Sequence, residues 1–294
     1  MLLLLKALSL KVFSFVLVGA VLGFLIRHRG EKTIQRFIWL ALNVLIPVFI
    51  FVSLWSSNVP VRTSLGVVLT ASIVLAAGFV FAWFWAKARH IHFRDQSLPI
   101  IIMNSAYLAL PVCKFIGGEE AFNYALVYNV VAMLVNFTFG IIAITRGNAL
   151  SEIFDMPIIY AVAAGLALNI AAVQVPAVVL KSNSLLSFVV LPAMLMLVGY
   201  RIAKIRLHSV KAAAYGVLLR MGGGFIVAFL CVKLFNLTGA AGLVCILSST
   251  MPAAVNTYIL AEYYKLDTDF AASTVVIGTA LSFFVIPLIY FFYK

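Results

Sequence analysis

Apolar runs of about 20 residues recur along this 294-residue chain, and no other feature limits the fold as strongly. One such run crosses a hydrocarbon core of roughly 30 Å as a helix. The chain is 65% hydrophobic and 10% charged, which a water-soluble domain of this length does not sustain. We therefore expect an all-α integral membrane protein. About ten transmembrane helices are predicted at residues 8–26, 34–55, 65–86, 98–116, 121–144, 157–175, 185–205, 212–235, 240–263 and 270–293.

The net charge of +12 indicates membrane topology rather than nucleic-acid binding, because the basic residues fall between the apolar runs. One set of alternate loops holds most of the 21 lysines and arginines, among them Arg201, Lys204 and Lys265. The positive-inside rule places the richer set in the cytoplasm. We expect a multi-pass protein of the cell (inner) membrane with both termini extracytoplasmic, and a first span that is retained rather than cleaved as a signal.

Signatures of soluble chemistry do not occur in the sequence. The three cysteines, Cys113, Cys231 and Cys245, lie inside predicted spans, where a thiol behaves as a small apolar group. Neither metal-ligand spacing, nor a phosphate-binding loop, nor a nucleophile elbow is present. The sequence therefore predicts neither an enzyme nor a bound metal or cofactor.

The two halves of the chain resemble each other at a nearly constant offset. Pro47 matches Pro192 at a separation of 145 residues, and Asn104 matches Thr250 at 146. Because each half holds five spans, an odd number, the second half enters the membrane in the opposite orientation. We therefore predict inverted repeats at 1–147 and 157–294, joined by a short cytoplasmic linker at 148–156.

Two polar, proline-bearing stretches interrupt the apolar pattern near corresponding places, at residues 103–118 and 248–264. In a bilayer every backbone N–H and C=O needs a partner, so a break at membrane depth survives only against protein or a wet cavity. Paired broken helices point to the substrate site of a secondary transporter. We expect the fourth and ninth helices to be broken at Pro111 and Pro252.

These stretches resemble the auxin efflux carrier family, which includes the PIN-type plant exporters and prokaryotic organic-acid permeases. NSAYLALPVCKFIGG resembles the family's fourth helix, and MPAAVNTYILAEYY with AASTVVIGTALSFFVIPL resembles its ninth and tenth. The match covers essentially the full length. One departure is Thr257, which stands where PIN-type carriers have a proline at the second crossing, with Pro252 five residues earlier.

The resemblance implies that helices 1, 2, 6 and 7 form a scaffold and that helices 3–5 and 8–10 form a transport unit. In that unit the broken fourth and ninth helices cross to form the substrate site. The resemblance also implies elevator-like movement of one domain against the other, and family precedent implies a homodimer.

Four polar residues near the breaks are candidate substrate ligands: Asn104, Ser105, Asn256 and Thr257. The Asn104 amide would donate to a carboxylate, and the alternative is an interhelical hydrogen bond without a ligand. Pro111 has no donor and would act by freeing backbone groups. The hydroxyl groups of residues 248–250 would equally bond to their own helix.

Other candidates are Asn43, Lys114, Arg220 and Glu262. Asn43 would face the site from the scaffold, or else pack there. Lys114 and Arg220 are charges inside spans, which are costly and so informative, and either would balance an anionic substrate or snorkel to a membrane face. Glu262 would be a gate or proton site, or a cap or ion-pair partner. A coupling carboxylate at mid-membrane is not evident, so the coupling ion, H⁺ or Na⁺, stays open.

We interpret the chain as a secondary transporter of a small organic anion, a mono- or dicarboxylate or an auxin-like acid. One alternative is a sodium-coupled carrier like the bile-acid symporters, and the scarcity of Asp and Glu inside the spans argues against it. A second alternative is a membrane sensor that binds a ligand without moving it.

Overall fold

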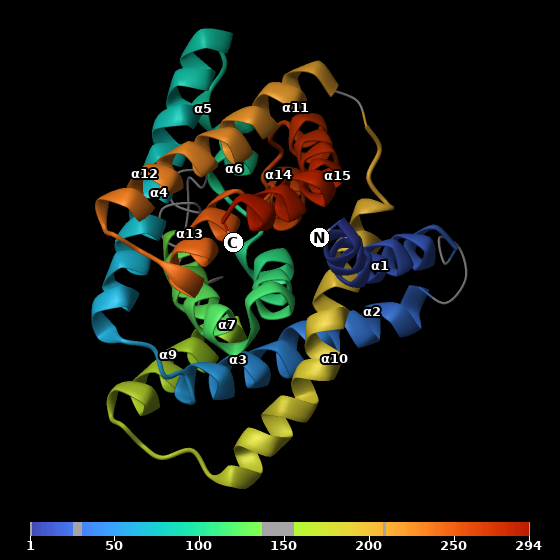
Figure 1. The fold of residues 1–294 in the computed structure, drawn as a ribbon. Helices are drawn as coiled ribbons and strands as arrows, with labels where there is room; N and C mark the ends of the chain where they lie inside the picture. The colour runs from blue at the N-terminus through green and yellow to red at the C-terminus, as the bar shows by residue number, and fades with distance from the viewer. Residues whose placement is uncertain (1, 26–30, 137–155, 208–209, 294) are drawn as a thin grey trace.

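The computed structural model describes residues 2–25, 31–136, 156–207 and 210–293, and these ranges are almost entirely helical (Figure 1). The predicted linker 148–156 lies outside the described residues, apart from Met156. With η for a π-helical segment, the elements are α1 (Leu2–Leu25), α2 (Glu31–Leu40), η1 (Ala41–Leu45), α3 (Ile46–Trp55), α4 (Val61–Arg89), α5 (Phe93–Gln96), α6 (Leu98–Ile101), η2 (Ser105–Ala109), α7 (Leu110–Val135), α9 (Pro157–Ile170), α10 (Ala177–Ile202), α11 (Val210–Val217), η4 (Leu218–Gly223), α12 (Gly224–Leu234), α13 (Gly239–Ser249), α14 (Asn256–Tyr263) and α15 (Thr268–Tyr293).

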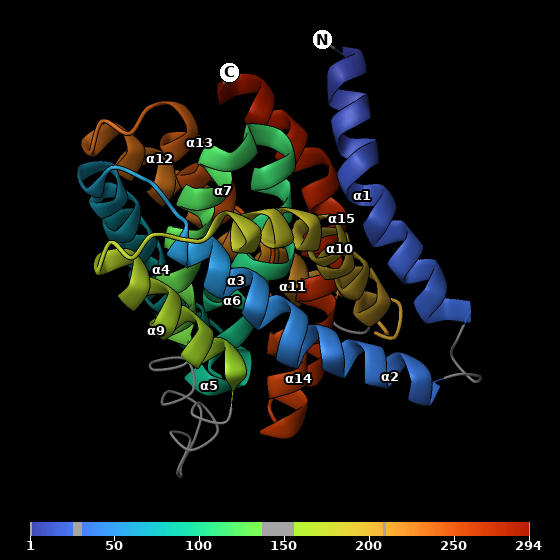
Figure 2. The ribbon, with the colours of Figure 1, turned by 90° about the horizontal axis from the view of Figure 1, so that it is seen from below.

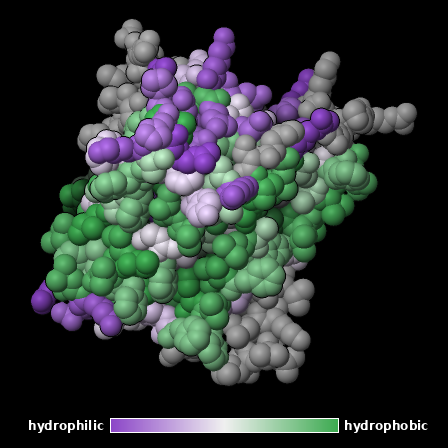
Figure 3. Space-filling model, turned by 90° about the horizontal axis from the view of Figure 1, so that it is seen from above, coloured by the Kyte–Doolittle hydropathy of each residue, from purple (hydrophilic) through white to green (hydrophobic). Residues whose placement is uncertain are grey.

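The described helices have the length and surface of a multi-pass membrane protein. Five are long and apolar enough to span a bilayer: Gln35–Trp55, Arg62–Arg89, Ala177–Ile202, Val210–Leu234 and Thr268–Tyr293. Ile170 and Phe188 expose 82% and 76% of their surface, and Figure 3 shows a broad hydrophobic belt with hydrophilic residues gathered towards its ends. A belt of this kind is what lipid tails cover.

Helices from the two halves of the chain pack against each other in pairs. α1 packs against α10, and α3 packs against α9 (Figure 1). A Cβ atom on Gly19 would overlap the backbone of Met196, and one on Gly199 would overlap the carbonyl of Val16. Small residues therefore let the backbones of α1 and α10 approach closely.

Gly118 divides α7 into two helices. Its backbone has φ 68° and ψ −154°, in a region that side chains with a Cβ avoid. The first part of α7 is the end of the fourth predicted span, 98–116, and the second part belongs to the fifth, 121–144. The last residues of that span, 137–144, lie outside the described part of the chain.

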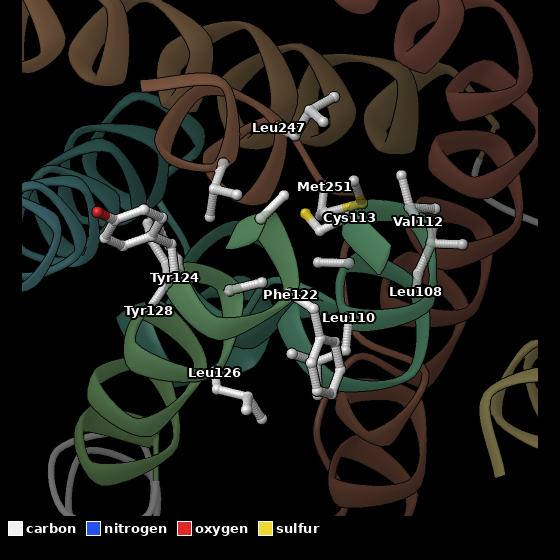
Figure 4. Packing of buried hydrophobic residues seen from close by; sticks show 14 of the residues in the cluster. Leu108, Leu110, Val112, Cys113, Phe122, Tyr124, Leu126, Tyr128, Leu247 and Met251 are labelled. Atoms are coloured by element: carbon white, nitrogen blue, oxygen red, sulfur yellow. The ribbon is translucent and has the colours of Figure 1, made fainter. Parts of the chain in front are cut away.

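The two parts of α7 carry much of the core beside the broken helices. Figure 4 shows Cys113 from the first part and Tyr128 from the second together with Leu247 and Met251 from the ninth predicted span. All four are buried. Figure 2 places the start of α1 and the end of α15 at one end of the molecule, with α5 and the far end of α14 at the other.

Candidate functional site

Two broken helices cross at a short pair of extended segments. The first half-helix ends with α6 at Ile101, and the second ends with α13 at Ser249. Met103 and Ala253 form an antiparallel bridge between the two breaks. The N–H of Asn104 donates to the carbonyl of Pro252 at 2.9 Å, and that of Ala254 donates to Ile102 at 3.0 Å. Each break thus supplies hydrogen-bond partners for the other, as the membrane interior requires.

The position of the first break differs from the sequence prediction. We expected it at Pro111, but that residue lies in the first turn of α7, where the helix is intact. The backbone is already helical from Ser105, and the π-helical turn of η2 just before Pro111 accommodates the missing N–H of proline. The break lies instead at residues 102–104. Pro252, in the second half, lies within the crossing itself.

Arg220 occupies the space between the two half-helices that end at the crossing. It comes from η4, its side chain is 2% exposed, and its Nη1 donates to the carbonyls of Ile100 and Ile101 at 3.2 and 2.9 Å. Its Nη2 donates to the carbonyl of Ser249 at 2.9 Å. A cation at helix C-termini is favourable because the carbonyls there carry the negative end of the helix dipole.

Burial excludes the alternative in which Arg220 snorkels to a membrane face. Its contact with substrate stays a prediction, since its described partners are backbone carbonyls. Gly224 makes this arrangement possible, because a Cβ atom there would overlap the carbonyl oxygen of Ser249.

Asn104 is the most distinctive polar residue of the crossing. It is 1% exposed, and neither its Oδ1 nor its Nδ2 has a hydrogen-bond partner within the described structure. Buried side-chain amides are normally bonded, so an unpaired amide calls for an explanation such as an absent ligand or water. Asn104 also directly precedes η2, the start of the half-helix that leaves the first break.

The second part of α7 bonds to one serine beside each break, Ser105 and Ser249. Ser105 Oγ donates to Asn129 Oδ1 at 2.9 Å, and Tyr128 Oη lies 2.8 Å from Ser249 Oγ. Sequence reasoning did not single out Tyr128 or Asn129, although polar groups inside an apolar span were the available signal. Ser105, a predicted ligand, is thus partly engaged by protein.

Asn256 and Thr257 begin α14, the half-helix that leaves the second break. Thr257 Oγ1 donates to the carbonyl of Ala254 at 2.7 Å, so it bonds its own chain. Asn256 Oδ1 accepts a hydrogen bond of 2.6 Å from Nη1 of Arg201, the penultimate residue of α10. Arg201 was counted with the loop charges although the predicted span 185–205 included it, and α10 ends one residue later, at Ile202.

The other predicted residues lie away from the bridge or have partners. Asn43 Nδ2 donates to the carbonyl of Trp39 in its own helix at 2.9 Å. Lys114 forms an ion pair with Glu119 and lies 5.2 Å from the ring centre of Phe122. Glu262 is exposed near the end of α14.

A groove of about 820 Å³ opens on the flank of the crossing, between α11–α12 and α15. Its wall is overwhelmingly apolar and includes Phe225, Phe229 and Leu288, with Thr250 the residue closest in sequence to the break. Such a lining matches lipid tails better than an anion. Within the described residues, no cluster of three or more His, Cys, Asp or Glu side chains could hold a metal ion.

Fold and crossing together define the class of this protein: a polytopic helical membrane protein with the paired broken helices typical of transporters. The family of membrane transport proteins matches residues 142–290, just over half of the chain. The chain belongs to this family, the auxin efflux carriers, as its sequence motifs indicated.

Two archaeal relatives carry the name uncharacterized transporter. The one from Methanocaldococcus jannaschii is 29% identical over 246 residues, which cover 75% of this chain and 77% of the relative. The one from Methanothermobacter thermautotrophicus is 25% identical over 302 residues, covering 93% and 94%. The family and both relatives are transporters rather than enzymes.

Proposed function

We propose that this transporter carries a small organic anion, bound at the crossing, by elevator-type alternating access. The observation that carries the proposal is the buried amide of Asn104, which has two unpaired polar atoms at the start of a half-helix. An amide offers N–H donors to a carboxylate, and the N-terminal end of a helix favours negative charge.

The charges around the crossing support an anion. The two half-helix ends that expose carbonyls already have a cation, Arg220. The two half-helices that begin beyond the breaks have no acidic residue in the first turn of η2, α7 or α14. The positive ends of the dipoles are therefore uncompensated within the described residues, and a substrate carboxylate would supply the missing charge.

Helix packing supports a division into a scaffold and a transport unit. α1 packs on α10 and α3 on α9, which would form the scaffold from helices 1, 2, 6 and 7. α7 packs on α13 and α4, and α11 packs on α15, as expected for helices 3–5 and 8–10. The full proposal comprises ten spans in two inverted repeats, a homodimer, and both termini outside the cytoplasm.

Counterflow tests the proposal. The purified chain is reconstituted into liposomes preloaded with unlabelled lactate, malate or benzoate, and entry of the same labelled acid is followed. We expect the labelled acid to accumulate in these liposomes to a higher level than in protein-free liposomes. Binding of these acids without counterflow would favour the ligand sensor, and failure of the whole panel would contradict an organic-anion carrier.

The same liposomes assign the coupling ion. Replacement of sodium by choline separates a sodium-coupled carrier from the proposed one, and a protonophore tests coupling to protons. Sodium-dependent flux would favour the alternative that resembles the bile-acid symporters.

A further inference from the structure

Arg201 brings a positive charge from the proposed scaffold to the edge of the crossing. The last turns of α10 pack there, because Val198 shares a buried cluster with Ala253 and Val255 of the second break. Arg201 itself is partly buried, and its Nη1 lies 2.6 Å from Asn256 Oδ1 at the start of α14. The guanidinium thus meets the half-helix end where an anion is favoured.

Three of the cations near the broken helices, Arg220, Lys114 and Arg201, differ in what already neutralises or bonds them. Arg220 is buried and donates to three backbone carbonyls. Lys114 is paired with the Glu119 carboxylate. Arg201 has a neutral amide as its hydrogen-bond partner, and no described carboxylate pairs with it.

A guanidinium has five N–H donors in a planar fork that fits the two oxygens of a carboxylate. The single hydrogen bond to Asn256 leaves most of the Arg201 donors available. Tyr107, from η2 beyond the first break, packs against the same cluster as Val198. Residues that follow both breaks therefore lie beside the last turns of α10, which carry Arg201.

We propose that Arg201 is the counter-charge that binds the carboxylate of the transported anion, with Asn256 and the start of α14 beside it. This inference rests on the proposed function and names the residue that distinguishes an anion from a neutral molecule. Because Arg201 belongs to α10 and Asn256 to α14, the carboxylate would be held between the scaffold and the transport unit.

Binding of matched acids and amides tests the proposal. Isothermal titration calorimetry on the purified full chain compares acetate with acetamide, lactate with lactamide, and benzoate with benzamide. The wild-type protein is expected to prefer at least one acid over its amide. Arg201→Gln should weaken binding of that acid by about tenfold or more, and leave the weak affinity for its amide unchanged.

Two further variants keep this test separate from folding. Arg201→Lys retains the charge and should recover part of the affinity. Arg206→Gln removes a charge from the exposed segment that follows α10, and should bind like wild type.

A tethered carboxylate provides an independent test. Asn256→Asp places an acid next to Arg201, where it should occupy the guanidinium and compete with the substrate. Carboxylate binding should therefore be weaker in Asn256→Asp than in Asn256→Ala, which removes the amide without adding charge.

The outcomes separate this inference from the proposed function. If Arg201→Gln binds the carboxylate as tightly as the wild type does, the role of Arg201 is overturned while the carrier proposal stands. The same holds if the variant loses binding of the acid and of the amide together. A wild-type protein that binds none of the acids would overturn both.

Discussion

Nη2 of Arg220 lies 2.9 Å from the carbonyl oxygen of Ser249, the last residue of α13. The same guanidinium reaches the last two residues of α6, Ile100 and Ile101. One buried cation therefore joins the ends of two half-helices that are far apart in the sequence. Loss of this cation would leave three backbone carbonyls without their charged donor.

Arg220→Gln should destabilise the protein by about 2–5 kcal/mol, the usual range when one partner of a buried charged network is removed. The stability of Arg220→Lys should fall between that of the wild type and that of Arg220→Gln, because an ammonium keeps the charge but not the planar fork. Thermal unfolding in detergent measures both. A wild-type melting temperature for Arg220→Gln would show that the contacts contribute nothing.

Gly224→Ala should weaken the crossing, because the added Cβ would meet the Ser249 carbonyl and lie 2.5 Å from Nη2 of Arg220. We expect a loss of about 1–3 kcal/mol, as for other overpacked sites. Gly222→Ala is the matched control. Its nearest neighbour is the flexible end of Leu218 at 3.3 Å, and alanine is the better helix former. Equal melting temperatures for the two variants would contradict the packing described here.

Tyr128→Phe removes the hydroxyl that lies 2.8 Å from Ser249 Oγ and keeps the ring. The expected loss is about 1 kcal/mol, the typical net contribution of one hydrogen bond. Tyr160→Phe, on a side chain that is 58% exposed, should leave the melting temperature unchanged. If the two variants melt alike, the Tyr128 hydroxyl does not support the crossing.

A disulfide should form across the bridge when Met103→Cys and Ala253→Cys are combined and the three native cysteines are replaced by alanine. Opposed residues of antiparallel strands have Cα atoms about 4.5–5.5 Å apart, within disulfide range. Mass spectrometry of the oxidised protein detects the linked peptides. Each single variant should show only free thiols. If the double variant also shows only free thiols, the two breaks do not lie side by side.

The sequence located the broken helices better than the break points. Polar residues and Pro252 identified the interruption of the ninth helix. In the fourth helix, the apolar residues 100–103 read as continuous helix, and Pro111 read as the breaker. The break occurs where Met103 pairs with Ala253, and no local pattern encodes a partner so distant in the chain.

The two arginines differed in how well sequence reasoning placed them. Arg220 was identifiable because a charge inside an apolar span is rare, but its carbonyl partners depend on tertiary packing. Arg201 lay inside the predicted span 185–205 but was counted with the loop charges, because a charge near the end of a span resembles a topological signal. Its contact with Asn256 required knowledge of how α10 meets the crossing.

Counterflow by Asn104→Ala tests the central claim most directly, using the acid that the wild-type protein carries. Asn183→Ala is the control, since Asn183 is a part-buried asparagine on α10 whose Nδ2 donates to Ser53 Oγ. With equal amounts of protein in the liposomes, we predict that Asn104→Ala loses nearly all counterflow while Asn183→Ala keeps it. Wild-type counterflow from Asn104→Ala would contradict an anion site at the crossing.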